Sequence, residues 1–107
     1  MKVTEIIYYQ LVQTNIRLVW CWGAHDWTEL NEYTLAFKVN AHRLDGIVCV
    51  TLDYNRDLYD ISFFHNKTYR SLRKTSIEAF EPITGVYFEQ LVYFIDDVTE
   101  KIDVYKY

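Results

Sequence analysis

The residues that could bind a metal or catalyse a reaction are few and widely spaced in this chain. His25, His42 and His65 lie far apart, and only His25 has a neighbouring carboxylate, that of Asp26. Hydrolytic metal sites need further His or Asp ligands at recognisable spacing, and none follows here. The chain also lacks a Gly-x-Ser-x-Gly turn, a phosphate-binding loop and a dinucleotide fingerprint. We therefore expect no catalytic residue, no metal and no cofactor, and a protein that is not an enzyme.

The run from Asp53 to Asp57 comes nearest to a metal-binding motif. Its sequence, Asp-Tyr-Asn-Arg-Asp, places oxygen ligands at the first, third and fifth positions of a calcium loop. Such a loop then needs a glycine at its sixth position and a bidentate glutamate at its twelfth, where this chain has Leu58 and Phe64. The pattern favours a hairpin turn stabilised by Asp and Asn side chains.

Four cations gather within eight residues in the basic segment. They are Lys67, Arg70, Arg73 and Lys74, with Tyr69 among them. Lysine and arginine can contact phosphates and a tyrosine can stack on an exposed base, so this segment is a candidate nucleic-acid site. The alternative is an edge strand whose cations discourage pairing with another sheet.

Between residues 75 and 105 the charge has the opposite sign, with seven acidic residues and one lysine. If a helix runs from Pro82 to about Asp103, a rotation of about 100° per residue gathers carboxylates on one side of it. Such a line can occupy a basic groove of a partner protein, although a solvated helix face is the simpler explanation. The line consists of Glu89, Asp96, Glu100 and Asp103 with Tyr93 beside them, and the stripe expected to face the core consists of Tyr87, Leu91, Phe94, Ile95, Val98 and Ile102.

Alternation of apolar and polar residues predicts the sheet that positions these groups. We expect an α+β fold with the order α-β-β-β-β-(β)-α, in which an antiparallel meander packs on one face against a short N-terminal and a long C-terminal helix. The predicted ranges are a helix over 3–13, strands over 16–23, 33–39, 47–52 and 58–65, an edge strand within 66–80 and the helix from Pro82, with a loop over 24–31.

Two of these strands, 16–23 and 47–52, are apolar on both faces, which implies a cover for the second face of the sheet. Trp20, Trp22 and Trp27 supply an aromatic surface that a partner protein, or a second copy in a homodimer, would bury. A strongly curved sheet that covers itself is the alternative.

Composition indicates a single domain, residues 1–107, with a core of its own. Half of the residues are apolar and 18% are aromatic, while Gly numbers 3 and Pro 1, which excludes a disordered chain. A formal net charge of −4 gives no broad positive field for nucleic acid. The chain has only two cysteines and no signal-peptide pattern, which predicts a reduced protein of the bacterial cytoplasm. It has no long apolar run, which predicts the absence of a membrane span.

Several short motifs, in order along the chain, match one family. They are Gly23-Ala24 after an apolar segment, Leu35-Ala36-Phe37, Val50-Thr51-Leu52-Asp53, Asp57-Leu58-Tyr59-Asp60 with Phe63, and Gly85 to Leu91. In these the chain resembles a family of small uncharacterised proteins from bacteriophages and other mobile elements, which implies a fold and a genomic setting without an activity. It departs from the family at Cys21-Trp22, where Met-Thr is usual, and at Thr99-Glu100-Lys101, where Thr-Gly and an apolar residue are usual.

These features predict a non-enzymatic phage or mobile-element protein that binds and inhibits a host or defence protein, alone or within a nucleoprotein complex, with anti-CRISPR activity as the sharpest version. The acidic line and the three tryptophans would form its binding surface. One alternative is an accessory nucleic-acid-binding protein that uses the basic segment. Another is a structural protein that assembles through an uncovered sheet face.

Overall fold

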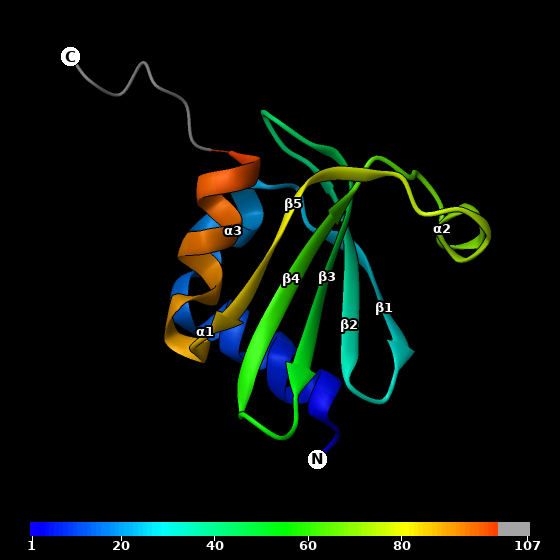
Figure 1. Cartoon of the computed structure of the whole chain (residues 1–107). Coiled ribbons are helices and arrows are strands. Elements are labelled where there is room, and N and C mark those ends of the chain that lie inside the picture. Colours follow the sequence, from blue (N-terminus) through cyan, green and yellow to red (C-terminus); the bar gives the residue numbers. More distant parts are fainter. Residues whose placement is uncertain (101–107) are drawn as a thin grey trace.

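The computed structural model describes residues 1–100, and Figure 1 shows how their helices and strands are arranged. Within this range the strands form one antiparallel sheet in the order β1-β2-β3-β4-β5, so the predicted α+β class and the meander are confirmed. The elements are α1 (Val3–Cys21), β1 (His25–Asn31), β2 (Thr34–Asn40), β3 (Asp45–Asp53), β4 (Leu58–Phe64), α2 (Tyr69–Lys74), β5 (Glu78–Val86), the 3₁₀ turn η1 (Phe88–Gln90) and α3 (Leu91–Thr99).

α1 extends well beyond the helix predicted over 3–13, and the strand predicted over 16–23 is wrong. Residues 16–21 continue α1 after an interruption at Asn15, whose φ of −162° and ψ of 88° are not helical. The Asn15 side chain accepts a hydrogen bond from the Leu18 amide at 3.3 Å, as an asparagine does at the start of a helix. A short run that is apolar on both faces fits a buried helix as well as a buried strand, so alternation misassigned this segment.

β1 lies where a loop was predicted over 24–31. Its sequence is polar because β1 is an edge strand of the sheet, with much of its length exposed to solvent. Its pairing with β2 shifts register between His25 and Thr28 and again between Glu29 and Asn31. The first strand of the sheet is therefore this polar segment and not 16–23.

The segment 66–80, predicted to form an edge strand, instead contains the short helix α2. Thr68 begins this helix, because its side chain accepts a hydrogen bond from the Ser71 amide at 3.1 Å. β5 follows as the second edge strand and contains Pro82, the residue predicted to open a helix. A proline has no amide hydrogen to donate, and an edge strand tolerates that loss.

The longest described helix is thus at the N-terminal side of the chain. α1 spans 19 residues, whereas α3 begins only at Leu91 and spans 9. The predicted end of the C-terminal helix near Asp103 lies outside the described residues. None of the helices in residues 1–100 has the length and apolar character needed to cross a membrane.

The main core lies between the sheet and the pair α1 and α3, which Figure 1 shows packed together on one side of the strands. Trp22, Phe37 and Phe63 are the largest of its fully buried side chains. Burial of each such side chain contributes about 1.5–3 kcal/mol, so this layer carries much of the stability. The buried strand residues of this core are Leu35, Phe37, Val39, Val48, Val50, Tyr59, Ile61, Phe63 and Val86.

The apolar part of the opposite sheet face is covered by α2. Leu72 and Tyr69 of this helix pack on Ala36, Ile47 and Cys49, which form a second small cluster. The sequence predicted that a partner, a second copy or the curvature of the sheet would cover this face. In the structure the chain covers it with its own helix α2. Figure 1 shows α2 standing apart from α1 and α3.

Candidate functional site

The three tryptophans lie in different environments and do not share one surface. Trp22 is fully buried, and its indole Nε1 donates a hydrogen bond to Asp96 Oδ1 at 3.0 Å. Trp27 is partly buried, with its ring centroid 4.4 Å from that of Phe37. Trp20 is 71% exposed. Of the three, Trp20 alone presents most of its ring to a partner.

Two carboxylates of the predicted acidic line are engaged inside the fold. Asp96 accepts the hydrogen bond of Trp22, and Glu100 Oε2 accepts one from the His42 amide at 2.7 Å. Each bond joins α3 to a distant segment, the end of α1 for Asp96 and the β2–β3 turn for Glu100. A partner that used these carboxylates would have to share or break the existing bonds, and loss of the Asp96 bond would leave the buried Trp22 donor unsatisfied.

Glu89 and Tyr93 are the members of the line that face solvent. Glu89 is exposed in η1, and Tyr93 is 50% exposed on α3. Asp103 lies outside the described residues. Tyr87 and Phe94 were predicted to face the core, but they are 59% and 36% exposed, because α3 begins later than predicted and turns other residues inward.

Most of the exposed aromatic side chains belong to α1, α3 and the turn that leads into α3. In residues 1–100 eight aromatic side chains are exposed, and seven of them lie on these elements, which form the helical layer. Tyrosine, tryptophan and phenylalanine are enriched in protein interfaces. The seven are Tyr8, Tyr9, Trp20, Tyr87, Phe88, Tyr93 and Phe94, and together they are the helical aromatic surface; the eighth is Tyr54 in the β3–β4 turn.

The basic segment forms a ridge on a helix instead of an edge strand. Arg70, Arg73 and Lys74 are exposed on α2, and none of them makes an ion pair within residues 1–100. Their spacing of three and four residues brings them to one side of the helix. These three residues are the α2 ridge.

Lys67 and Tyr69 are engaged in contacts within the chain. The Lys67 ammonium lies 2.8 Å from Asp45 Oδ2. The Tyr69 hydroxyl donates to the Asp26 carbonyl oxygen at 2.6 Å, and the Lys38 ammonium lies 5.4 Å from the Tyr69 ring centroid. Burial raises the pKa of Tyr69 to about 12. This ring packs on the sheet, so it would have to leave that contact to stack on a base.

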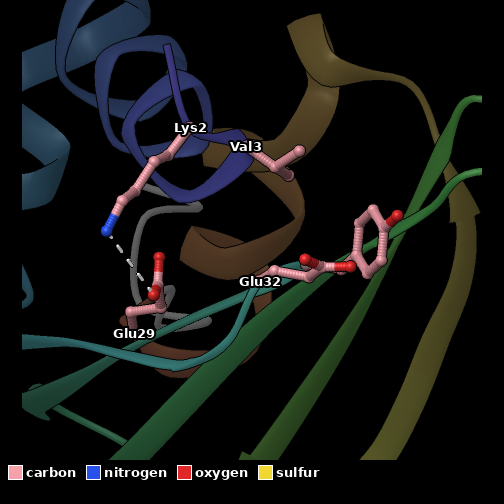
Figure 2. Close-up of a pocket in the computed structure, with 5 residues that line it drawn as sticks. Lys2, Val3, Glu29 and Glu32 are labelled. Carbon is pink, nitrogen blue, oxygen red and sulfur yellow. Dashed lines mark ion pairs between the residues drawn. The ribbon is translucent and has the colours of Figure 1, made fainter.

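A hollow of about 400 Å³ lies between the start of α1 and the β1–β2 turn, as Figure 2 shows. Lys2 pairs there with Glu29 at 3.8 Å, a long contact between two exposed side chains. The charge of Glu32, together with burial and a hydrogen bond to the same side chain, raises the pKa of Tyr33. The lining residues, Lys2, Val3, Glu29, Glu32 and Tyr33, offer no Ser, Cys or His for a nucleophile and base.

The run from Asp53 to Asp57 forms the β3–β4 hairpin turn. Asp53 Oδ1 accepts a hydrogen bond from the Asn55 amide at 3.2 Å, and Asp53 Oδ2 accepts one from Arg56 Nε at 2.7 Å. The hydrogen bond from Arg56 lowers the pKa of Asp53. In the described part of the chain, no three His, Cys, Asp or Glu side chains gather closely enough to hold a metal ion.

Sequence reasoning did not find the hollow of Figure 2 or the exposure of Tyr8 and Tyr9. The hollow joins residues about thirty positions apart that share no motif, and only the packing of α1 against the β1–β2 turn creates it. The exposure of the two tyrosines depends on which side of α1 meets the sheet. Comparison with known proteins finds no family model, no curated protein and no solved structure that matches this chain.

Proposed function

We propose that this chain is a non-enzymatic protein-binding module that captures a host or defence protein and inhibits it by covering its surface. The supporting observation is the helical aromatic surface, which holds seven of the eight exposed aromatic side chains in residues 1–100. Burial of large exposed rings against a partner is favourable because it removes apolar surface from water. Such rings contribute most of the binding energy of many interfaces. The choice of a host or defence protein as the partner is based on the resemblance to mobile-element proteins. Anti-CRISPR activity is the most specific form of this proposal.

Inhibition in this proposal needs binding alone. The helical layer is packed on the sheet, so its backbone is already ordered before a partner binds the rings. Glu89 follows Phe88 directly and adds a negative charge beside the rings. That charge favours a partner with a basic surface, such as a protein that itself binds nucleic acid.

The test is a pull-down with the tagged protein from a nuclease-treated lysate of the cells that carry the gene, beside an untreated lysate. Trp20→Ala with Phe88→Ala removes rings that are 71% and 52% exposed, and Tyr54→Ala, at 73% exposed, is the matched control on the β3–β4 turn. We expect a partner that survives nuclease, is kept by Tyr54→Ala and is lost by the double variant. A partner kept by every variant would contradict this surface, and loss of all partners with nuclease would contradict protein binding.

A second candidate function is nucleic-acid binding through the α2 ridge. It is supported by three exposed cations on one side of α2 that make no ion pair in the described part of the chain. Arg70→Ala with Arg73→Ala should weaken binding to a labelled single strand and reduce the slope of log affinity against log salt by about 1.4. Lys2→Ala, an exposed cation on α1's N-terminal side, is the control. Failure of the natural chain to bind at low salt would eliminate this candidate.

Self-assembly through an uncovered sheet face was proposed because the second face of the sheet needed a cover. Leu72 and Tyr69 of α2 cover the apolar cluster on that face, so this reason no longer applies. A homodimer formed through the helical aromatic surface is a different arrangement. Sedimentation at several protein concentrations would detect it beside the pull-down.

A further inference from the structure

A hollow of about 190 Å³ lies against the first half of α1, and three of its six lining residues are aromatic. The rings of Tyr8 and Trp27 meet at 87° with centroids 4.9 Å apart, and those of Tyr8 and Tyr9 at 72° with centroids 5.7 Å apart. Both pairs are therefore in edge-to-face contact. The residues that line the hollow are Thr4, Glu5, Tyr8, Tyr9, Trp27 and Leu35.

The only formal charge among these lining residues is that of Glu5. Glu5, Tyr8 and Tyr9 stand at positions i, i+3 and i+4 of α1, so the carboxylate and two rings share one side of the helix. Glu5 is exposed and makes no ion pair within residues 1–100. Trp27 comes from β1 and is held in place by its contact with Phe37. The hollow therefore brings together three aromatic rings and a carboxylate that makes no ion pair within residues 1–100.

This combination selects for a cation of a particular kind. The faces of aromatic rings carry negative charge and attract cations within about 6 Å of the ring centroid. A primary ammonium needs three hydrogen-bond acceptors to replace its water. The Glu5 carboxylate and the hydroxyls of the lining can supply acceptors, whereas the carbon surfaces of the rings and Leu35 supply none. An ammonium whose hydrogens are replaced by methyl groups donates no such bonds and gains contact with the rings.

We propose that this hollow is a binding site for a methylated ammonium group, with Tyr8, Tyr9 and Trp27 as its aromatic walls and Glu5 as its counter-charge. The ring faces hold the methyl groups, and the carboxylate of Glu5 favours the positive charge over a neutral group of the same shape. Tyr8 and Tyr9 also belong to the helical aromatic surface, but the site is tested with small cations and no partner protein, so its outcome is independent of the proposed inhibition.

The test is an NMR titration of the full chain with choline, followed at the three indole N–H resonances. 3,3-Dimethyl-1-butanol, which replaces the charged nitrogen by carbon, is the matched neutral ligand. We expect a saturable shift at the Trp27 indole, with the neutral ligand about tenfold weaker. No saturation at the Trp27 indole, or equal affinity for the two ligands, would overturn the proposal.

Two further ligands distinguish the source of the cation. A short peptide with trimethyllysine and the same peptide with unmodified lysine are titrated beside choline. Tighter binding of the trimethyllysine peptide than of choline supports a cation carried by a protein, and tighter binding of choline supports a free metabolite. Preference for the unmodified peptide over the methylated one would overturn the assignment of a methylated ammonium.

Variants at exposed positions locate the site without disturbing the core. Glu5→Gln and Tyr9→Leu should each weaken choline binding several-fold, whereas Glu89→Gln, which changes an exposed carboxylate on η1, should leave it unchanged. The Trp22 indole resonance reports in the same spectra that the core is intact, because this group is bonded to Asp96. Wild-type affinity in both the Glu5 and the Tyr9 variant would refute the site.

Discussion

The indole of Trp22 and the carboxylate of Asp96 are joined by a 3.0 Å hydrogen bond between residues 74 positions apart. The bond links the end of α1 to α3, and the Trp22 ring stacks on Phe37 with centroids 6.2 Å apart. Both Trp22 and Asp96 are residues that the sequence placed on a partner-binding surface. In the fold they join α1 to α3 within the helical layer that packs on the sheet.

Asp96→Ala should therefore destabilise the protein. The substitution leaves the buried Trp22 N–H without an acceptor, and an unsatisfied buried donor costs about 1–3 kcal/mol. Asp96→Asn keeps an acceptor oxygen and should recover most of the loss. Urea unfolding measures both, with Glu89→Ala as the control for removal of an exposed carboxylate. Equal stability of Asp96→Ala and the natural chain would show that the bond contributes nothing.

Arg43 should stabilise the C-terminal end of α3. Its amide donates to the Thr99 carbonyl oxygen at 2.7 Å, its guanidinium donates to the Asp97 carbonyl oxygen at 3.4 Å, and the guanidinium lies 5.8 Å from the Phe80 ring centroid. A cation at this end also interacts favourably with the helix dipole.

Arg43→Ala keeps the amide bond and should lower the free energy of unfolding by about 0.5–1 kcal/mol. His42→Ala is the control, since the His42 contact with Glu100 uses only the main-chain amide. The comparison is made by urea unfolding at low salt. A larger loss for the His42 variant than for the Arg43 variant would contradict this role.

Gly46 should tolerate no side chain. A Cβ at this buried position would clash with the main-chain carbonyl oxygen of Phe64 in the neighbouring strand, and backbone cannot move aside as a flexible side chain can. Gly46→Ala is expected to cost at least about 3 kcal/mol or to prevent folding.

Gly85→Ala is the matched comparison, because Gly85 has a positive φ of 70° but its nearest neighbours would lie 3.8 Å away. Strain of that backbone conformation alone costs about 1–2 kcal/mol. Thermal unfolding of the two variants ranks them. A Gly46 variant as stable as the Gly85 variant would mean that the β3–β4 pairing can yield at this point.

Alkaline pH should weaken the fold through Cys49. Burial raises the pKa of this thiol from 9.0 to about 12, so the folded chain favours the protonated form more than the unfolded chain does. The stabilisation is complete below about pH 9 and is lost as pH rises toward 12. Tyr69, whose pKa burial raises from 10.0 to about 12, acts in the same direction.

Unfolding free energies across this alkaline range should therefore fall for the natural chain and fall less steeply for Cys49→Ala. A thiol reagent at neutral pH should modify Cys21, which is exposed, and reach Cys49 only after unfolding. Parallel pH profiles for the two proteins would contradict the role of Cys49, as would rapid modification of both thiols in the folded state.

Residue patterns alone located the three central strands, and the reason is local. In 33–39 and 58–65 apolar and polar side chains alternate, whereas 47–52 is a short apolar run bounded by turn-forming residues. Neighbouring residues therefore suffice to define β2, β3 and β4. The same local rules failed at the edges. β1 is too polar and β5 contains Pro82, features that an edge strand accepts because half of its backbone groups face solvent.

The candidate sites depended far more on tertiary structure. Composition identified acidic, basic and aromatic residues, but burial decided which of them remain on the surface. Trp22 is in the core, Asp96 accepts its hydrogen bond, and Arg70 is exposed on α2. The ring-walled hollow brings Glu5 of α1 to Trp27 of β1 only after the helix packs on the sheet. The sequence by itself determined the fold class and the types of side chain on offer, because alternation and turns are short-range. Only the tertiary structure decided which side chains meet and which face solvent, because those relations join residues far apart in the chain.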